Sequence, residues 1–559
     1  MQIQQAPREI KVKTVRFSLR RGKLLFSFKS GREQGNITGL YLKQRNAVTE
    51  CKYPFVLKKR EKGNTVVCDA SLDANLLSLE VAFWDIVAQV ETPEEEFEAV
   101  IGGQSSLRKL WLILFPRWTR TEDGHMIYPF VNGARQFTIQ YRRWDKRYDS
   151  YGFIAKEYLA LLCYFLLKPY WDGKKLWLVC EKFCSMAQDN AYYFFKYCME
   201  ELPQKERKHI LYVMDKGARD YAALKPYEDN VIDFMSFKYM IYLCAAQYLI
   251  STDAIRHFYI WDSPNSVYKV LYQARKHIIF LQHGVMGFKQ CHRTFHKQGG
   301  NRMALFVTSS GYEKEIIRKY FEYDEEEIIV TGLPRWDVLR DTSSEHGKEI
   351  LLMPTWRIWL ENASDEAFVR SDYYKNYKAF LTDERLHALL KEHGLVLNFY
   401  LHPKFRDYMH DFSVDAEEIR LISFGDMPLN SLLMSCRMLI TDYSSVAWDV
   451  YYQEKPVLFY PFDYDVYEKQ QGSYMDLRTE AFGSVVMSVD ELLAGIESCV
   501  YNDFKENEDA AERREWLLPL RDHDNSKRVY KAIRDAKFDS KLMNRFRKER
   551  TKSKNELQL

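Results

Sequence analysis

The sequence predicts an α/β protein with two successive, doubly wound parallel-sheet domains, preceded by a small β-rich N-terminal domain. Short apolar runs alternate with amphipathic helical segments over residues 174–338, and the pattern repeats over residues 339–535. Alternation of this kind predicts parallel strands whose connecting helices cover both faces of a sheet. Residues 1–105 instead carry short β-rich runs separated by turn residues, which is typical of an antiparallel β domain.

Length and composition agree with this division. At 559 residues the chain exceeds a single hydrophobic core, and 46% hydrophobic with 28% charged residues indicates a globular protein. A net charge of only +3 argues against a basic body that binds nucleic acid. The N-terminal residues lack the apolar core of a signal peptide, and the apolar run Tyr158–Leu167 has about half the ~20 residues that a membrane span needs. We therefore expect a cytoplasmic protein.

Residues 106–173 are interpreted as a helical connector between the β-rich domain and the first α/β series. They contain two aromatic, apolar stretches beside several arginines and lysines. Such a segment is either an interfacial patch on an anionic membrane surface or a connector buried against its neighbours. The tail, residues 536–559, is basic: from Lys541 it carries seven lysines and arginines against two glutamates.

In the first series, one strand ends in the sequence IIFLQHG, so that Gln282, His283 and Gly284 follow a buried strand. Ligands of parallel sheets bind at the carboxyl ends of the strands. Histidine is the side chain best suited to take a proton near neutral pH, and glycine lets the backbone approach a ligand closely. His283 is therefore the candidate catalytic residue, with an ordinary hydrogen-bonded histidine as the alternative.

In the second series, the sequence LITDYSS places hydroxyl side chains between a strand and a helix. Free backbone N–H groups at a helix start bind phosphate, although the same residues also serve as simple helix caps. The candidates are Thr441, Asp442, Ser444 and Ser445.

Three further segments follow predicted strands. His402, in FYLHPKF, and Arg357, in MPTWR, would lie on the same sheet edge, where the planar guanidinium suits phosphate oxygens. A structural histidine and an arginine packed on tryptophan are the alternatives. Arg335 and Asp337, in GLPRWD, lie at the boundary of the two series and either pair as a hinge clamp or face a cleft.

The ordered set HG, SSGYEKEII, GLPRWD, PTWR, LHP and TDYSSVAWDVYYQEKPVLFYPFD, over residues 175–530, resembles the CDP-glycerol glycerophosphotransferase family of teichoic-acid polymerases and primases. The resemblance implies a GT-B fold with two facing domains, no metal or other cofactor, and peripheral attachment to the inner face of the cell membrane. It implies transfer of glycerol phosphate or ribitol phosphate from a CDP-linked donor to a hydroxyl of a lipid-linked polymer, with release of CMP. The product would be teichoic acid or a phosphate-containing capsule.

The resemblance also implies roles for the candidates. His283 would be the general base, and the donor pyrophosphate and ribose would be held by Arg357, His402, Thr441, Asp442, Ser444 and Ser445. The acceptor side of the cleft would include Gln282, Gly284, Lys289, Arg335 and Asp337. This sequence departs from the family pattern around the base, where Trp usually precedes HG and Thr-Pro-Leu-Lys follows it. The departure leaves the acceptor and the polyol open.

Two other functions fit parts of the sequence. A GT-B glycosyltransferase that uses a nucleotide sugar would share the fold, but it would usually carry acidic residues where TDYSS stands. A catalytically silent membrane adaptor would use the aromatic and basic segments alone, and it would have no need of His283, His402 and the hydroxyl cluster. Whether the chain forms a homo-oligomer is also open.

Overall fold

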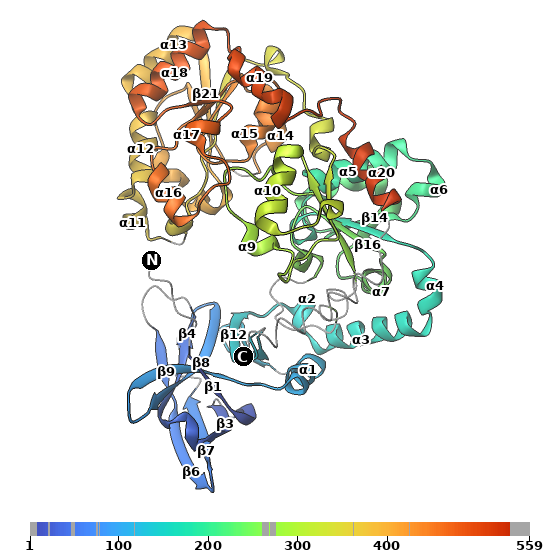
Figure 1. The fold of residues 1–559 in the computed structure, drawn as a ribbon, viewed down its shortest axis with the longest axis vertical. Coiled ribbons are helices and arrows are strands. Elements are labelled where there is room, and N and C mark those ends of the chain that lie inside the picture. Colours follow the sequence, from blue (N-terminus) through green and yellow to red (C-terminus); the bar gives the residue numbers. More distant parts are fainter. Residues whose placement is uncertain are drawn as a thin grey trace. The chain divides into compact units, whose positions relative to one another are not determined.

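The computed structural model describes residues 8–20, 23–45, 51–73, 77, 79–116, 118–132, 134–259, 268, 276–361, 363–423 and 425–536. The chain forms two compact units (Figure 1). Unit 1 comprises Met1–Leu166 with Tyr259–Ala274, and unit 2 comprises Leu167–Phe258 with Arg275–Leu559. The basic tail expected from Lys541 onwards lies outside the described residues.

Unit 1 is built on two mainly antiparallel sheets, one ordered β2-β3-β7-β6 and the other β1-β9-β8-β12-β11-β10, with β4 paired to β8 and β5 to β4. Alternate residues of β3 point into a core that contains Phe26, Phe28 and Trp84. The strands are β1 Glu9–Lys11, β2 Lys13–Arg20, β3 Lys23–Gly31, β4 Asn36–Gln44, β5 Lys52–Pro54, β6 Val56–Lys62, β7 Thr65–Asp73, β8 Ala82–Glu91, β9 Glu96–Gly102, β10 Thr119–Arg120, β11 His125–Val131 and β12 Phe137–Arg143. The β-rich N-terminal region is thus present.

The region expected to be a helical connector, residues 106–173, is helical only towards its two ends. There it forms α1 (Ser106–Leu114), and then α2 (Lys146–Asp149), α3 (Tyr151–Leu166) and α4 (Lys168–Asp172). Between them β11 and β12 pair antiparallel, and β12 continues the sheet through β8. Both strands are rich in aromatic and β-branched residues that are buried on both faces, which favours strand over helix.

Unit 2 contains two fully parallel sheets. The first parallel sheet is ordered β15-β14-β13-β16-β17-β18-β19 and the second β22-β21-β20-β23-β24-β25. The strands are β13 Trp177–Cys180, β14 Ile210–Met214, β15 Val231–Asp233, β16 Tyr248–Ser251, β17 His277–Phe280, β18 Leu305–Thr308, β19 Ile328–Val330, β20 Lys348–Leu352, β21 Leu395–Tyr400, β22 Ile419–Ile422, β23 Met438–Thr441, β24 Val457–Phe459 and β25 Ser484–Val485. Each sheet reverses its direction of growth once, between β13 and β16 and between β20 and β23, and ligands of such sheets bind at these switch points.

Helices connect the parallel strands, because a parallel pair needs a crossover. Several begin at a side-chain cap, as where Ser310 accepts a hydrogen bond from the backbone of Glu313. After the second sheet, α20 returns to pack on α5. The ring centroids of Tyr530 on α20 and Trp177 in the first sheet are 5.7 Å apart. The helices after α4 are α5 Asn190–Glu201, α6 Gln204–Arg207, α7 Phe237–Ala245, α9 His292–Phe295, α10 Gly311–Phe321, α11 Asp365–Val369, α12 Asp372–Leu381, α13 Glu384–His393, α14 Leu429–Ser435, α15 Val446–Tyr452, α16 Tyr464–Gln470, α17 Leu477–Glu480, α18 Val489–Tyr501, α19 Glu508–Leu517 and α20 Asn525–Asp535.

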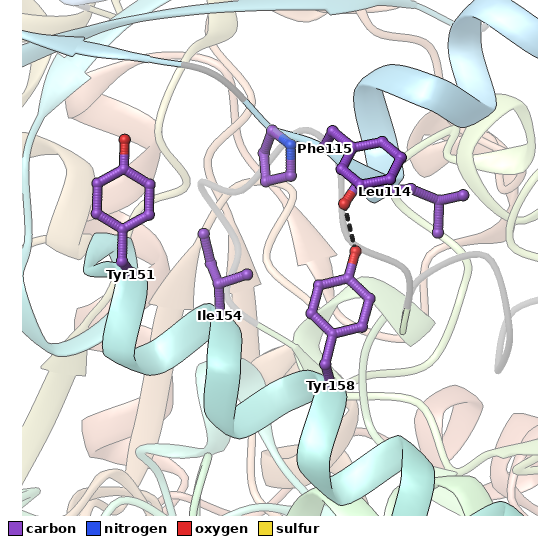
Figure 2. A pocket seen from close by; sticks show the side chains of 6 residues that line it. Leu114, Phe115, Tyr151, Ile154 and Tyr158 are labelled. Carbon is purple, nitrogen blue, oxygen red and sulfur yellow. Dashed lines mark hydrogen bonds between the residues drawn. The ribbon is translucent and has the colours of Figure 1, made fainter.

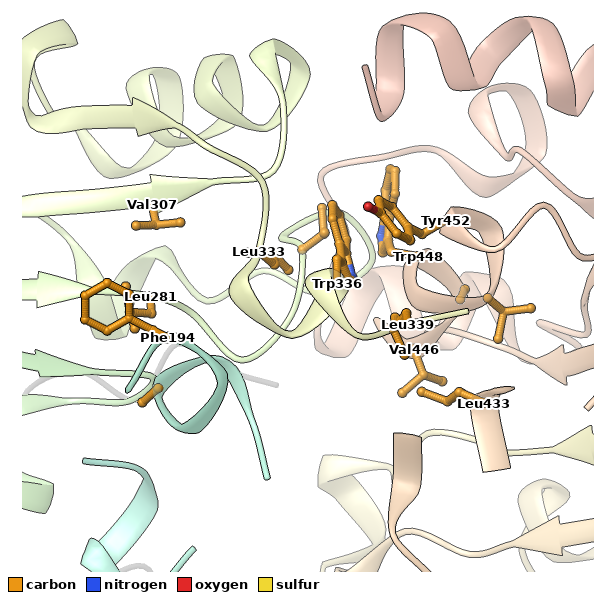
Figure 3. Packing of buried hydrophobic residues seen from close by; sticks show 14 of the residues in the cluster. Phe194, Leu281, Val307, Leu333, Trp336, Leu339, Leu433, Val446, Trp448 and Tyr452 are labelled. Atoms are coloured by element: carbon orange, nitrogen blue, oxygen red, sulfur yellow. The ribbon is translucent and has the colours of Figure 1, made fainter. Parts of the chain in front are cut away.

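A continuous hydrophobic core joins the two parallel sheets of unit 2 (Figure 3). It runs from Leu281 beyond the end of β17 to Trp336, which stacks on Tyr452 of α15 with ring centroids 4.7 Å apart. On the same helix Trp448 stacks with Phe288, at 5.6 Å. Because large aromatic side chains contribute much of the buried area in a core, this cluster holds the ends of the two sheets together.

Within the described residues, no helix is both long enough and apolar enough to cross a membrane.

Candidate functional site

The loop that carries His283 leaves β17 through a left-handed residue. Gln282 has φ of 60° and is fully buried, and its carbonyl accepts a 2.8 Å hydrogen bond from the Asn190 side chain. Its own amide donates to the carbonyl of Val307. Left-handed non-glycine residues persist only where their surroundings hold them. The turn leaves the His283 side chain exposed, with Nδ1 3.3 Å from the Thr252 carbonyl oxygen.

The buried side chain of Glu313 holds the same loop through hydrogen bonds to its backbone. Glu313, in the first turn of α10, accepts 2.6 Å hydrogen bonds from the backbone N–H groups of Met286 and Ser309. Burial raises the pKa of Glu313, although these backbone hydrogen bonds oppose the shift. The segment SSGYEKEII therefore matters for the site, because its glutamate anchors the residues that follow His283.

Arg335 ties the His283 loop to the second parallel sheet. Its guanidinium donates to the carbonyl of His283 at 2.8 Å, to Asp189 at 2.9 Å, and to both carboxylate oxygens of Asp449 on α15 at 2.8 and 2.9 Å. Burial opposes the charge, but Asp449 and Asp189 outweigh burial and raise the pKa of Arg335. A single residue thus fixes the backbone of His283 relative to α15.

The pairing of Arg335 with Asp337, offered as one interpretation of GLPRWD, is wrong. Asp337 accepts hydrogen bonds from the backbone N–H groups of Asn525 and Ser526, each at 2.8 Å, and so holds the start of α20. The two residues lie two positions apart on the 3₁₀ turn Pro334–Asp337, where side chains point in different directions.

In the second parallel sheet, β23 ends at Thr441, whose hydroxyl donates to the Met353 carbonyl at 2.7 Å. Asp442 follows and accepts from the backbone of Thr355 at 2.7 Å, from the backbone of Tyr443 at 2.6 Å, and from the Tyr377 hydroxyl at 3.0 Å. Thr441 and Asp442 have no exposed surface. Their hydrogen bonds join the ends of β20 and β23, at the switch point of this sheet.

Arg357 is also completely buried, between two carboxylates. It forms a two-pronged ion pair with Asp463 at 2.7 and 3.0 Å and contacts Asp442 at 2.8 Å. Burial disfavours its charge, yet Asp442 and Asp463 raise the pKa of Arg357 well above the usual value. The sequence interpretation did not single out Asp463, although its position after the strand of KPVLFYPFD was a usable signal.

Two loops from different sheets meet at Gly284. A Cβ atom at this position would overlap the Ser445 side chain, so only glycine allows the approach. A Cβ atom at Gly287 would lie 3.1 Å from the Trp448 ring, a tight contact rather than an overlap. The His283 loop therefore sits directly on the TDYSS loop, where Ser444 and Ser445 are only partly buried.

His402 and Lys289 lie near each other around Trp356. Lys289 Nζ is 4.7 Å and Lys404 Nζ 3.7 Å from the centre of the Trp356 ring, and the His402 ring is 6.0 Å from it. Among the described residues, Lys289 has no ion-pair partner, whereas Lys404 pairs with Glu361 at 2.5 Å. We call Lys289, His402 and Lys404 the basic cluster.

Burial lowers the pKa of His402 to about 3, and the charges of Lys289, Lys404 and Lys182 add to this effect. Its Nδ1 accepts a 3.2 Å hydrogen bond from the backbone of Lys404, which leaves the proton of the neutral ring on Nε2. His402 is therefore a neutral hydrogen-bond donor near pH 7. In the described part of the chain, no group of three His, Cys, Asp or Glu side chains is arranged to hold a metal ion.

These residues combine an exposed imidazole, two accessible hydroxyls and two lysines beside a neutral histidine at the ends of two parallel sheets. Such an arrangement is suited to hold an anionic ligand while the imidazole accepts a proton. His283, Gly284, Arg335 and Ser445 are brought together, and so are Lys289 and His402. Three of the predicted residues are fully buried instead: Arg357, Thr441 and Asp442. Asp337 contacts the start of α20.

Comparison with known proteins identifies a family. The family model for CDP-glycerol:poly(glycerophosphate) glycerophosphotransferase matches residues 171–535. The minor teichoic acid biosynthesis protein GgaB of Bacillus subtilis is 28% identical over 420 residues, which cover 72% of this chain and 44% of that protein. A teichoic acid poly(glycerol phosphate) polymerase of the same organism is 32% identical over 244 residues, or 39% of this chain and 29% of the relative.

The chain thus spans less than half the length of these two relatives. A structure described as the wall teichoic acid polymerase TagF aligns with 18% identity and a TM-score of 0.46, and the alignment covers 72% of this chain and 99% of that one.

Proposed function

Because the chain belongs to the CDP-glycerol:poly(glycerophosphate) glycerophosphotransferase family, we propose that it transfers glycerol phosphate or ribitol phosphate from a CDP-linked donor to a hydroxyl of a lipid-linked acceptor. CMP is the second product, and the polymer is a teichoic acid or a phosphate-containing capsule. The observation that carries this proposal is the close contact of the His283 loop with the TDYSS loop, beside the basic cluster. The proposal includes a GT-B arrangement, in which the two parallel-sheet domains face one cleft.

In the proposed reaction, Nε2 of His283 takes the proton of the acceptor hydroxyl. The hydroxyl oxygen attacks the phosphorus that bears the polyol, the P–O bond to CMP breaks, and CMP leaves with the electron pair. The Thr252 carbonyl beside Nδ1 supports this role, because a proton on Nδ1 leaves Nε2 free to act as the base. Gln282, Gly284 and Arg335 hold the backbone of the base in place.

On the donor side, Ser444, Ser445 and His402 are assigned to the pyrophosphate. Lys289, which the resemblance places on the acceptor side, is reassigned to the donor because it lies near His402 around Trp356. Their partial exposure and the lack of a carboxylate partner for Lys289 among the described residues support this assignment. We assign a supporting role to Arg357, Thr441 and Asp442: they hold the TDYSS loop in its conformation. Their polar groups already form hydrogen bonds with protein atoms. Positioning and charge stabilisation of this kind account for most of the catalysis in phosphoryl transfer.

A donor screen tests the function. Purified protein is incubated with a lipid-linked acceptor and with CDP-glycerol, CDP-ribitol or a set of nucleotide sugars, and the released nucleotide is measured. We expect release of CMP from a CDP-polyol that depends on the acceptor. Sugar transfer from a nucleotide sugar would identify a glycosyltransferase instead, and the absence of transfer from every donor would favour the adaptor.

We also propose that unit 1 attaches the protein to the anionic inner face of the cell membrane. Leu159, Leu162 and Leu166 follow the i, i+3, i+7 spacing of one helical face on α3, and they are 53%, 54% and 71% exposed. Between α1 and α3 lies an open apolar groove of about 600 Å³ (Figure 2). The groove is lined by Leu114, Phe115, Pro116, Tyr151, Ile154 and Tyr158. Exposed apolar surface of this extent supports contact with a membrane.

Replacement of Leu159, Leu162 and Leu166 by glutamine is expected to weaken binding to anionic liposomes at least about tenfold, since each buried leucine contributes roughly 1.5–3 kcal/mol. Co-sedimentation at low salt measures the bound fraction. The matched control replaces Val466, Met487 and Tyr501, three exposed apolar residues of unit 2, and should bind like the wild type. Equal binding by the leucine variant would contradict the attachment site.

A further inference from the structure

The four-stranded sheet of unit 1, which contains β3, β7 and β6, has one strongly basic face (Figure 1). Its inner face packs on the core through Phe26, Phe28 and Cys68. Side chains alternate between the two faces of a strand, and directly opposite residues on neighbouring strands share a face. The strand register therefore identifies the exposed basic residues of the outer face, which we call the cationic face: Lys13 and Arg16 on β2, Lys23 and Lys29 on β3, and Lys58, Arg60 and Lys62 on β6.

Acidic residues balance only part of this charge. Among the described side chains, the carboxylates on the same face are those of Asp69 and Asp73 on β7. Asp69 accepts a 2.7 Å hydrogen bond from a serine hydroxyl of β3 and pairs with Arg60, whose side chain is still 73% exposed. Within the described residues, Lys58 and Lys62 form no ion pair. The outer side of β6 therefore offers positive charge to a ligand.

Two lysines of the cationic face lie directly opposite each other. Lys13 on β2 pairs in register with Lys29 on β3, and both side chains are exposed. Like charges in this position destabilise a sheet. Lysines on an edge strand prevent pairing with other chains, but β3 lies inside the sheet, so edge protection does not account for Lys29. An anionic ligand would relieve the repulsion between the two ammonium groups.

The charges on β6 are evenly spaced. Lys58, Arg60 and Lys62 occupy alternate positions on one side of the strand, so they follow one another at about 6.8 Å, twice the rise per residue. A repeat of poly(glycerol phosphate) has as many backbone bonds as two amino-acid residues, and it extends over about 7 Å at most. Each repeat carries one phosphodiester charge. The row on β6 thus matches successive phosphodiesters of an extended chain.

We propose that the cationic face of unit 1 binds the polyanionic glycerol phosphate chain of the acceptor. The proposal rests on the function proposed above and extends it from the reacting hydroxyl to the rest of the polymer. The chain lies along β6, with its phosphodiesters facing Lys58, Arg60 and Lys62. A bilayer surface is also anionic, but it has no fixed linear period, so the even spacing on β6 favours the polymer.

The test is a triple variant, Lys58→Gln with Arg60→Gln and Lys62→Gln. Its affinity for end-labelled poly(glycerol phosphate) that carries no lipid is measured by fluorescence anisotropy, without donor. We expect binding at low salt to weaken roughly tenfold, the combined effect of three exposed charge pairs. The slope of log Kd against log salt concentration should fall by about two, since each neutralised phosphate of a single-stranded polyanion contributes ~0.7. A poly(ribitol phosphate) chain with the same number of phosphates, whose repeat is longer, should bind the wild type more weakly, and tighter binding would contradict the choice of occupant.

Two controls accompany the triple variant. Replacement of Lys58 and Lys62 by arginine and of Arg60 by lysine keeps the charges and should keep the affinity. The matched control removes the same charge from unit 2 through three exposed lysines, and it should bind like the wild type: Lys205→Gln, Lys348→Gln and Lys469→Gln. Weaker binding by this control would show that the net charge of the protein, and not the cationic face, attracts the polymer. Because all these side chains are exposed, every variant should fold.

The outcomes separate the two proposals. In the CMP release assay, the triple variant should keep its kcat and its KM for an acceptor with one glycerol phosphate unit, while its KM for a long acceptor rises about tenfold. If the wild type releases no CMP from any CDP-polyol, the proposed function fails, but the binding assay still decides the role of the cationic face. Equal affinity of the wild type and the triple variant for the polymer overturns that role. A triple variant that keeps the polymer and loses binding to anionic liposomes overturns it as well, because the face would then contact the membrane.

Discussion

Replacement of His283 by alanine is expected to leave donor binding intact and to reduce CMP release by roughly 10²- to 10⁴-fold, the usual contribution of a general base. The side chain is exposed, and Gln282, Gly284, Arg335 and Glu313 hold its loop through backbone contacts that the substitution leaves in place. The loss should therefore appear in kcat. Turnover is measured with a CDP-polyol and acceptor, and donor affinity by calorimetry without the acceptor.

His346→Ala is the control for this substitution, because His346 is exposed in the segment between β19 and β20 and has no part in the proposed site. It should retain wild-type turnover. If His283→Ala also turned over at the wild-type rate, His283 could not be the base. A loss of donor affinity in that variant, with kcat preserved, would move His283 from catalysis to donor binding.

Replacement of Arg357 by methionine is expected to destabilise unit 2 by about 3–5 kcal/mol, the usual effect of breaking a buried ion pair. Methionine fills part of the space but leaves the carboxylates of Asp442 and Asp463 without their cation, in a site where Arg357 has no exposed surface. The free energy of unfolding is measured by denaturant titration, with a fluorescence signal from the tryptophans of unit 2.

Arg385→Met provides the matched control. Arg385 also pairs with two carboxylates, those of Asp383 and Asp490, but its side chain is 61% exposed. Exposed ion pairs contribute only about 0–1 kcal/mol to stability. The free energy of unfolding of this variant should therefore equal that of the wild type. If Arg357→Met kept its stability and lost only donor affinity, Arg357 would contact the donor directly, and its assignment as a support of the loop would be wrong.

Much of unit 2 could be predicted from local patterns. The apolar runs of KLWLVC, HIIF and RMLIT become β13, β17 and β23, and the helical segments between the runs connect parallel strands. A buried parallel strand needs a short run of apolar residues, and this requirement is visible in the sequence alone. The prediction was poorer over residues 106–173, where aromatic, apolar residues suit a packed strand as well as a helix.

The sequence by itself determined which residues follow the strands, and so which ones lie on the edges of the two sheets where a ligand can bind. Only the tertiary structure decided which of these edges meet. Gly284 lies against Ser445, and Arg335 links His283 to Asp449, because the core around Trp336 and Trp448 brings distant parts of the chain together. Asp463 acquired Arg357 as its partner in the same way. Contacts between residues far apart in the chain depend on how buried side chains pack, and local periodicity carries no information about that packing.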